Sequence, residues 1–209
     1  MAGGDTVTGW FETTDSTDEE IMAATYRALC AHGYAGTTIS RIGEEFEKSQ
    51  SLLYYHYDDK DDLLADFLAY LLDRLEADLQ DTEMTEPRQR LTALFEKLAP
   101  SDPDEAQRQF FQALLEMRAQ TPHNPAYRDQ FERSDALIVA ELTETIEAGI
   151  EQGTFVEVDA DRTAAFLYST LYGTLDRCVT LGEWELFDQT RRELDRYIET
   201  TLLADVAED

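Results

Sequence analysis

Positive charge is scarce in this chain of 209 residues. Lys and Arg together number 17 against 45 Asp and Glu, which gives a formal net charge of -28. Hydrophobic residues nevertheless make up 43% of the sequence, far more than an acidic disordered chain carries, so the charge belongs on a folded surface. Acidic residues spread along a whole chain keep a protein soluble at high salt. The composition therefore predicts a halophile-type protein of a salt-rich cytoplasm.

Cysteines and long apolar runs are also few. Cys30 and Cys178 lie far apart in the sequence, which favours a reduced intracellular chain over a disulfide framework. No stretch approaches the roughly 20 apolar residues of a membrane-spanning helix. The N-terminus has neither the basic start nor the apolar run of a signal peptide. We therefore expect a cytoplasmic protein without a membrane partner.

Motifs of helical metal enzymes and of hydrolases are missing. The residues three positions before the three histidines are Leu29, Leu53 and Gln120. The Glu-x-x-His pairs of carboxylate-bridged metal bundles therefore do not occur. The sequence also has no His-Glu-x-x-His, no Gly-x-Ser-x-Gly and no phosphate-binding Gly loop. We predict no catalytic residue, no metal and no cofactor, and a helical-bundle enzyme remains only a weaker alternative.

Helical periodicity covers most of the chain after residue 16. Residues 1–16 lack it, so we expect a flexible N-terminal arm in which Trp10 and Phe11 are candidates for docking. Thr17 begins a capping box, and Gly33 is placed to end the first helix. Further helices are predicted over 39–46 and 50–57, from Asp58 or Asp59 onward, and over 126–152, 160–181 and 184–206. Pro87, Pro103 and Pro125 each stand where a helix can begin. No convincing alternating strand is present, which predicts an all-α fold.

Three predicted helices lie within residues 17–62, and a tight turn separates the last two. This arrangement is typical of a helix-turn-helix domain, with the motif itself at about 38–57. The remaining residues, 63–209, are expected to form a helical bundle. The sequence therefore predicts a small three-helix domain followed by a larger helical domain.

Residues 37–64 read TTISRIGEEFEKSQSLLYYHYDDKDDLL and resemble the DNA-binding signature of TetR-family transcription regulators. The residues on that pattern are Thr38, Ile42, Ser49, Leu53, Tyr54, Tyr57, Lys60, Leu63 and Leu64. The C-terminal part is similar in its helical layout and in the phrases GIEQGTF and LYGTLD. The resemblance implies a sequence-specific regulator that acts as a ligand-responsive repressor. Its 63–209 region would bind an effector and dimerise. Its partners would be a palindromic double-stranded DNA operator and a second copy of the chain.

The third predicted helix carries the groups that would read DNA. Ser49, Gln50 and Ser51 provide donors and acceptors at its N-terminus, and a Gln amide can pair with both N6 and N7 of adenine. Leu52 and Tyr55 are candidates for contacts with thymine methyl groups. The resemblance implies phosphate contacts from Thr38, Tyr54, His56 and Lys60. Thr37, Arg41 and Lys48 complete the predicted DNA-binding set.

The resemblance also implies an effector pocket and a dimer interface. The pocket would take a small apolar or aromatic effector, although each of its residues also suits plain core packing. The candidate pocket residues are Phe67, Leu71, Phe95, Phe110, Phe111, Leu114, Met117, Tyr127, Phe131 and Tyr172. The candidate dimer residues are Phe166, Leu167, Thr170, Leu171, Thr174, Leu175, Val179, Leu194, Tyr197, Ile198 and Leu202.

Two features of the predicted motif depart from an ordinary DNA-binding protein. Glu47 and Lys48 occupy turn positions where the family usually has a small and an apolar residue. Residues 37–60 also hold three basic against five acidic side chains, so the attraction to DNA through counterion release is weak. We therefore expect a shallow or inverted salt dependence of DNA binding.

The main alternative to a DNA-binding regulator is a DNA-free regulatory adaptor or small-molecule-binding protein on the same fold. A redox sensor at Cys30 or Cys178 is a lesser alternative.

Overall fold

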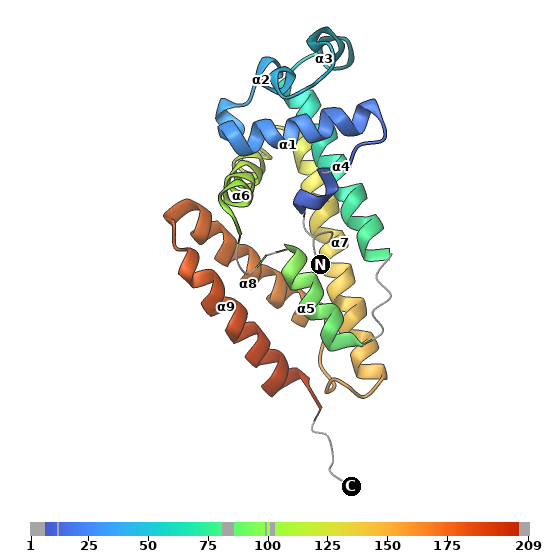
Figure 1. Cartoon of the computed structure of the whole chain (residues 1–209). Helices are drawn as coiled ribbons and strands as arrows, with labels where there is room; N and C mark the ends of the chain where they lie inside the picture. Colours follow the sequence, from blue (N-terminus) through green and yellow to red (C-terminus); the bar gives the residue numbers. More distant parts are fainter. Residues whose placement is uncertain (1–6, 12, 81–85, 99, 101–102, 205–209) are drawn as a thin grey trace. The chain divides into compact units, whose positions relative to one another are not determined.

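The protein is described here by a computed structural model, which covers residues 7–11, 13–80, 86–98, 100 and 103–204 (Figure 1). Its elements are η1 (Val7–Phe11), α1 (Thr17–Gly36), α2 (Ile39–Glu44), α3 (Gln50–His56), α4 (Lys60–Gln80), α5 (Pro87–Leu98), α6 (Glu105–Arg118), α7 (Pro125–Glu151), α8 (Ala160–Leu181), α9 (Trp184–Tyr197) and η2 (Ile198–Leu202). No strand ladder occurs in these described ranges, where the single pair Phe155 and Leu203 forms an isolated bridge. The prediction of an all-α fold is confirmed.

The chain divides into two compact units. Unit 1 contains Met1–Asp78 and Asp102–Ser134, and unit 2 contains Leu79–Ser101 and Asp135–Asp209. Helices α4 and α7 both continue from one unit into the other. Unit 1 thus combines the helix-turn-helix segment with most of α4, with α6 and with the start of α7, and it is larger than the 17–62 domain expected from the sequence.

Local capping groups set where the helices begin. Thr38 caps α2, because its hydroxyl accepts a hydrogen bond of 3.2 Å from the Arg41 amide, as the sequence predicts. The cap of α1 is Ser16 rather than Thr17, and its hydroxyl accepts from the Glu19 amide. Pro87 and Pro125 are the first residues of α5 and α7, as expected. Each of these signals operates within one helical turn.

Gly33 turns the end of α1 towards α2. Its φ is 65°, in the left-handed region that glycine adopts at little cost, and it interrupts the helical geometry of α1. The Thr37 amide donates to the Gly33 carbonyl at 3.0 Å, and the Thr37 hydroxyl donates to the same carbonyl at 2.7 Å. The predicted left-handed cap residue is therefore found at Gly33, although one further turn follows it before Thr37.

The N-terminal segment η1 packs against unit 1. The Trp10 indole donates to Asp78 at 2.8 Å, and the Phe11 ring stacks on Tyr26 of α1 with centroids 4.4 Å apart. Phe11 also lies within 6.0 Å of Phe67 and 5.9 Å of Tyr70, both on α4. The expectation of a flexible arm over 1–16 is thus corrected for residues 7–11, because two buried aromatic side chains hold them in place.

Unit 2 contains the helical pair α8 and α9, which run side by side (Figure 1). Gly182, with φ 71°, forms the left-handed cap between them. Helix α9 ends at Tyr197 and continues as a π-helical stretch, η2, to Leu202, whereas the periodicity predicts a helix that reaches residue 206. The end of η2 and the chain after it pair with the turn after α7: the Val156 amide donates to the Leu202 carbonyl at 2.8 Å, and the Ala204 amide donates to the Thr154 carbonyl at 2.9 Å.

The turn between α7 and α8 depends on Gly149. A Cβ at this position would lie 2.0 Å from the Phe155 ring, so only glycine lets the ring close over α7. Phe155 is itself buried and forms the bridge with Leu203. The GIEQGTF phrase of the sequence is therefore the segment that fixes the C-terminal end of unit 2.

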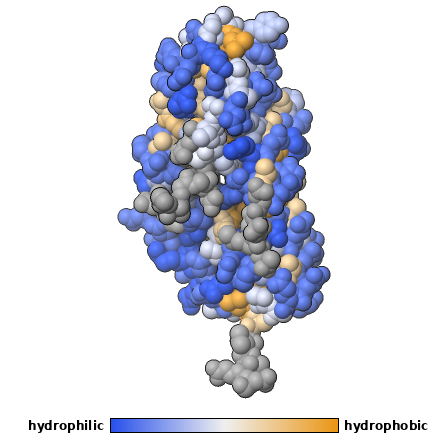
Figure 2. Space-filling model, turned by 45° about the vertical axis from the view of Figure 1, so that its right-hand side comes forward, coloured by the Kyte–Doolittle hydropathy of each residue, from blue (hydrophilic) through white to orange (hydrophobic). Residues whose placement is uncertain are grey.

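The surface is predominantly hydrophilic on the face that Figure 2 displays, with hydrophobic residues in scattered spots. No helix in the part of the chain that the structure describes is both long and apolar enough to cross a membrane.

Candidate nucleic-acid interface

Packing within the helix-turn-helix segment decides which side chains reach its surface. Ile42 of α2 and Leu53 of α3 are fully buried, and Tyr57 closes the far end of α3 against the core. On the other side of α3, Tyr54 is 58% exposed and Tyr55 is 84% exposed. Burial of these two rings against a partner would remove their apolar surface from water, which is favourable. The exposed face of α3 is therefore available to a partner.

The N-terminus of α3 presents three polar side chains. The hydroxyls of Ser49 and Ser51 lie 2.6 Å apart and share a hydrogen bond, and Ser49 makes no side-chain cap. The Gln50 amide donates to the carbonyl and to the hydroxyl of Ser40 on α2, both at 3.1 Å. The structure thus brings the three predicted reading residues together and adds Ser40, which was not predicted from the sequence.

The basic side chains of this segment are engaged within the protein. Lys48 donates to the Thr17 hydroxyl at 2.8 Å and pairs with Glu20 at 2.8 Å. The Arg41 guanidinium donates to the Gly36 carbonyl. These contacts hold α1 to the segment that follows it, and they leave the α3 face without a basic patch.

Lys60 has a similar internal role. Its ammonium donates to the Tyr34 carbonyl at 3.2 Å and lies 4.0 Å from the centroid of the Tyr34 ring. The contact combines a charge-assisted hydrogen bond with a cation–π interaction at the C-terminal end of α1, where the helix dipole favours a cation. Lys60 therefore fixes the first turn of α4 against α1.

The remaining predicted contacts differ in exposure. Thr38 and His56 are exposed and Leu52 is half-buried, whereas Thr37 is only 1% exposed. The Thr37 hydroxyl is used at the end of α1, so the structure does not bring it to the α3 face. The predicted set is thus divided between an outer group on α3 and inner groups that hold α1, α2 and α4 together.

Acidic side chains around Tyr57 affect its ionisation. Burial, followed by the nearby Asp66, Asp18 and Asp62 carboxylates, raises the pKa of Tyr57 to about 12. Desolvation and Asp62 also raise the pKa of Asp66 above its ordinary value. The excess of negative charge that the composition predicts is therefore also found around Tyr57, at the C-terminal end of α3.

The predicted effector residues are shared between the two units. Phe67, Phe111, Met117 and Tyr127 are buried in unit 1. Leu71, Leu114 and Phe131 are half-buried there, whereas Phe95 and Tyr172 belong to unit 2. In unit 1 the Phe110 ring lies edge-on to Tyr26 at 4.9 Å and to Phe67 at 6.2 Å. These side chains form the core between α1, α4 and α6.

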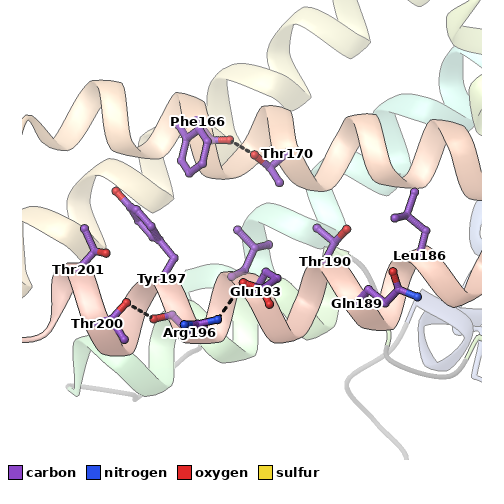
Figure 3. A pocket seen from close by; sticks show the side chains of 11 residues that line it. Phe166, Thr170, Leu186, Gln189, Thr190, Glu193, Arg196, Tyr197, Thr200 and Thr201 are labelled. Atoms are coloured by element: carbon purple, nitrogen blue, oxygen red, sulfur yellow. Dashed lines mark hydrogen bonds and ion pairs between the residues drawn. The ribbon is translucent and has the colours of Figure 1, made fainter.

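A pocket of about 550 Å³ lies in unit 2 between α8 and α9 (Figure 3). Phe166 lines this pocket and is 51% exposed, and its ring is tilted against that of Tyr197 with centroids 5.5 Å apart. The lining includes four predicted dimer residues, which are Phe166, Thr170, Leu194 and Tyr197. Four others, Leu171, Thr174, Ile198 and Leu202, are buried within unit 2 itself. Phe166, Thr170 and Tyr197 therefore lie at an open face, whereas Leu194 and these four residues are buried inside unit 2.

Metal binding finds no support in the described ranges, where no group of three or more His, Cys, Asp or Glu side chains is placed to hold an ion. The two cysteines are likewise poor nucleophiles, because burial raises the pKa of Cys30 to about 11 and raises that of Cys178.

Comparison with known proteins identifies the architecture. Residues 21–67 match the family model described as bacterial regulatory proteins of the tetR family, and residues 87–203 match the C-terminal domain of BetI-type transcriptional repressors. The chain belongs to the TetR family. This TetR-family chain is therefore a DNA-binding transcription regulator rather than an enzyme, as the sequence predicts.

Several relatives of this TetR-family regulator are informative. A TetR transcription regulator from Haloarcula marismortui is 40% identical, with a TM-score of 0.79, over 89% of this chain and 98% of that one. A Saccharomonospora viridis protein described as a transcriptional regulator, solved with choline, is 25% identical over 91% of this chain and all of that one, with a TM-score of 0.75. The transcriptional repressor AcnR of Corynebacterium glutamicum is 24% identical over 78% of this chain and 81% of its own length.

Proposed function

We propose that this regulator is a repressor that binds a palindromic operator as a homodimer, with one α3 helix of each subunit in the major groove. The observation that carries the proposal is the exposed face of α3, where Ser49, Gln50 and Ser51 lie at the N-terminus and Tyr54 and Tyr55 follow. Hydroxyl and amide groups at this end of a helix suit base edges and phosphates.

The open face of α8 and α9 supports the homodimer. It combines the exposed Phe166 ring with Thr170 and Tyr197, and it carries Glu193 and Arg196 within 4.0 Å of each other. A surface with both charges side by side can meet its own copy across a twofold axis, because each acid then faces a base. Such a dimer would place its two α3 helices about 34–36 Å apart, or one turn of DNA.

A small molecule is the proposed effector, acting in the cytoplasm where the operator lies. The related Saccharomonospora viridis protein was solved with choline, and the predicted effector residues of this chain include many aromatic side chains, the type that recognises a quaternary ammonium. An apolar aromatic compound is the other class that these side chains suit. Either effector must bind the DNA-free conformation more tightly, since a ligand shifts only an equilibrium that it binds unequally.

The first experiment is a binding titration with DNA from upstream of the protein's own gene, in molar potassium chloride. Saturable, sequence-selective binding is expected for the wild-type protein, and weaker binding is expected in Gln50→Ala and in Tyr54→Ala. Gln112→Ala is the matched control, because Gln112 is exposed on α6, away from α3, and its amide donates to Glu116 of the same helix.

Adding choline or an aromatic compound to the preformed complex tests the effector. Release of DNA by one of them identifies its chemical class. Absence of selective DNA binding at every salt concentration would contradict the proposal and favour a DNA-free adaptor, which the acidic surface of the helix-turn-helix segment would suit.

A further inference from the structure

The orientation of the Gln50 amide is fixed by α2. Its Nε2 lies 3.1 Å from the Ser40 carbonyl oxygen and 3.1 Å from the Ser40 hydroxyl. A backbone carbonyl only accepts hydrogen bonds, so the NH₂ group of the amide, and not its oxygen, must face α2. The two N–H groups of Gln50 are thereby directed to the two oxygens of Ser40, and the amide oxygen is not engaged by Ser40.

Gly43 provides the space for this arrangement. A Cβ on Gly43 would lie 2.5 Å from Cγ and 2.8 Å from Nε2 of Gln50. Both distances are shorter than real Cβ contacts, so any side chain at this position would displace Gln50 from Ser40. A glycine inside a helix is unfavourable compared with alanine. Its presence in the short helix α2 therefore serves the packing of Gln50.

We infer that Ser40 and Gly43 determine which bases Gln50 reads. Bidentate pairing with adenine needs both a donor and an acceptor from the amide. With its N–H groups held by Ser40, Gln50 presents an acceptor to the major groove. The matching partner is an exocyclic amino group, which adenine has at N6 and cytosine has at N4. This inference rests on the proposed function and adds that the position read by Gln50 accepts adenine or cytosine and rejects guanine and thymine.

The chemistry of the four bases makes this distinction sharp. In the major groove the hydrogen-bonding groups of guanine (O6 and N7) and of thymine (O4) are all acceptors. The amide oxygen of Gln50 is also an acceptor, and two acceptors repel each other. A side chain held in one orientation before binding also loses less conformational freedom when DNA arrives. Ser40 is thus a positioning residue that acts through Gln50, without a base contact of its own.

The test is selection of DNA ligands from a random library by the full-length protein in molar potassium chloride. The operator position that changes in Gln50→Ala is the one that Gln50 reads. Wild-type protein is expected to enrich adenine and cytosine there to a similar extent. Ser40→Ala frees one N–H group, so it should favour adenine over cytosine by about fivefold or more. Ser40→Thr keeps a hydroxyl and should restore the wild-type preference.

Gly43→Ala provides the second variant. It should lose base preference at the Gln50 position while other positions of the operator stay selective, which loss of folding would not do. Ser134→Ala on α7 is the control for removing a serine hydroxyl elsewhere. If wild-type protein selects no motif, both the proposed function and the inference fail. If a motif is selected but Ser40→Ala leaves the Gln50 position unchanged, the inference alone is overturned.

Discussion

The hydroxyl of Tyr127 donates a hydrogen bond of 3.0 Å to Oδ1 of Asp61, which joins α7 to the first turn of α4. The Tyr34 hydroxyl lies 3.4 Å from the same oxygen. Tyr127 is fully buried, whereas Asp61 is exposed. Burial and the Asp61 carboxylate together raise the pKa of Tyr127. The two partners of this hydrogen bond therefore differ in exposure: the Tyr127 hydroxyl is buried, whereas the Asp61 carboxylate reaches water.

Because of this difference in exposure, removal of Asp61 and removal of the Tyr127 hydroxyl should destabilise the protein by different amounts. Asp61→Ala leaves the buried Tyr127 hydroxyl without its acceptor and should lower the free energy of unfolding by about 1–3 kcal/mol. Tyr127→Phe returns the carboxylate to water and should cost about 1 kcal/mol. Asp61→Asn keeps an acceptor oxygen and serves as the control. Urea unfolding at constant salt measures all three, and a larger loss in Tyr127→Phe than in Asp61→Ala would contradict the argument.

The packing of η1 predicts a second difference in stability. Phe11→Ala removes a buried ring and should lower the free energy of unfolding by about 3 kcal/mol. Trp10→Phe keeps an aromatic ring but loses the bond to Asp78, and it should cost about 1 kcal/mol.

The sequence has two tryptophans, so Trp184→Phe leaves Trp10 as the sole indole fluorophore. Its emission should shift to that of solvent-exposed indole in the Phe11→Ala background if η1 undocks.

Stability should fall at alkaline pH through Tyr57. A tyrosine in the unfolded chain has a pKa of about 10. Burial raises the pKa of Tyr57 to about 12 in the folded protein, so between these values the folded state holds a proton that the unfolded state has lost. The contribution is fully present below pH 10 and is lost as pH rises towards 12. Tyr57→Phe should weaken this fall, and an identical pH profile in the variant would contradict it.

DNA binding should depend weakly on salt. An ordinary basic regulator loses about 10³–10⁵ in affinity between about 50 and 200 mM salt, because its cations displace counterions. In this protein Arg41, Lys48 and Lys60 are bonded internally, so a loss below about tenfold over that range is expected. Glu47→Lys adds an exposed cation and should steepen the logarithmic slope by about 1. A steep slope in the wild-type protein would show that the internal contacts open on DNA.

The dimer should depend on the open face of α8 and α9. Phe166→Glu places a charge on this face beside Glu193 and should raise the dissociation constant of the dimer by about thirtyfold or more. Leu181→Glu changes another exposed apolar residue of α8, which lies outside the pocket lining, and is the control. Sedimentation at several protein concentrations distinguishes the two. Equal dissociation constants would place the interface elsewhere.

The sequence predicted best what depends on neighbouring residues. The Thr38 cap, the left-handed Gly33 and the start of α7 at Pro125 were all found, because each involves groups within about one helical turn. The α1 cap was wrong by one residue, since Ser16 and Thr17 both carry a hydroxyl and only the backbone conformation decides between them. The TetR-family resemblance carried the assignment of function.

Contacts between distant residues were beyond the sequence patterns. Nothing local indicates that Trp10 meets Asp78, or that the end of α9 pairs with the turn after α7. The contact between Ser40 and Gln50 was not predicted for the same reason. Gly43, a glycine inside the predicted second helix, was nevertheless a usable signal that another group approaches closely there. The placing of DNA contacts, effector pocket and dimer interface remains a prediction for the experiments above.

Helix α9 is restrained at both ends within unit 2. Before its first turn, the Cys178 thiol donates to the Glu183 carbonyl at 3.3 Å; after its last, the Ala204 amide donates to the Thr154 carbonyl at 2.9 Å. A displacement of α9 along its own axis would lengthen one of these two hydrogen bonds and so would cost free energy in either direction. Unit 2 therefore resists a piston-like movement of α9.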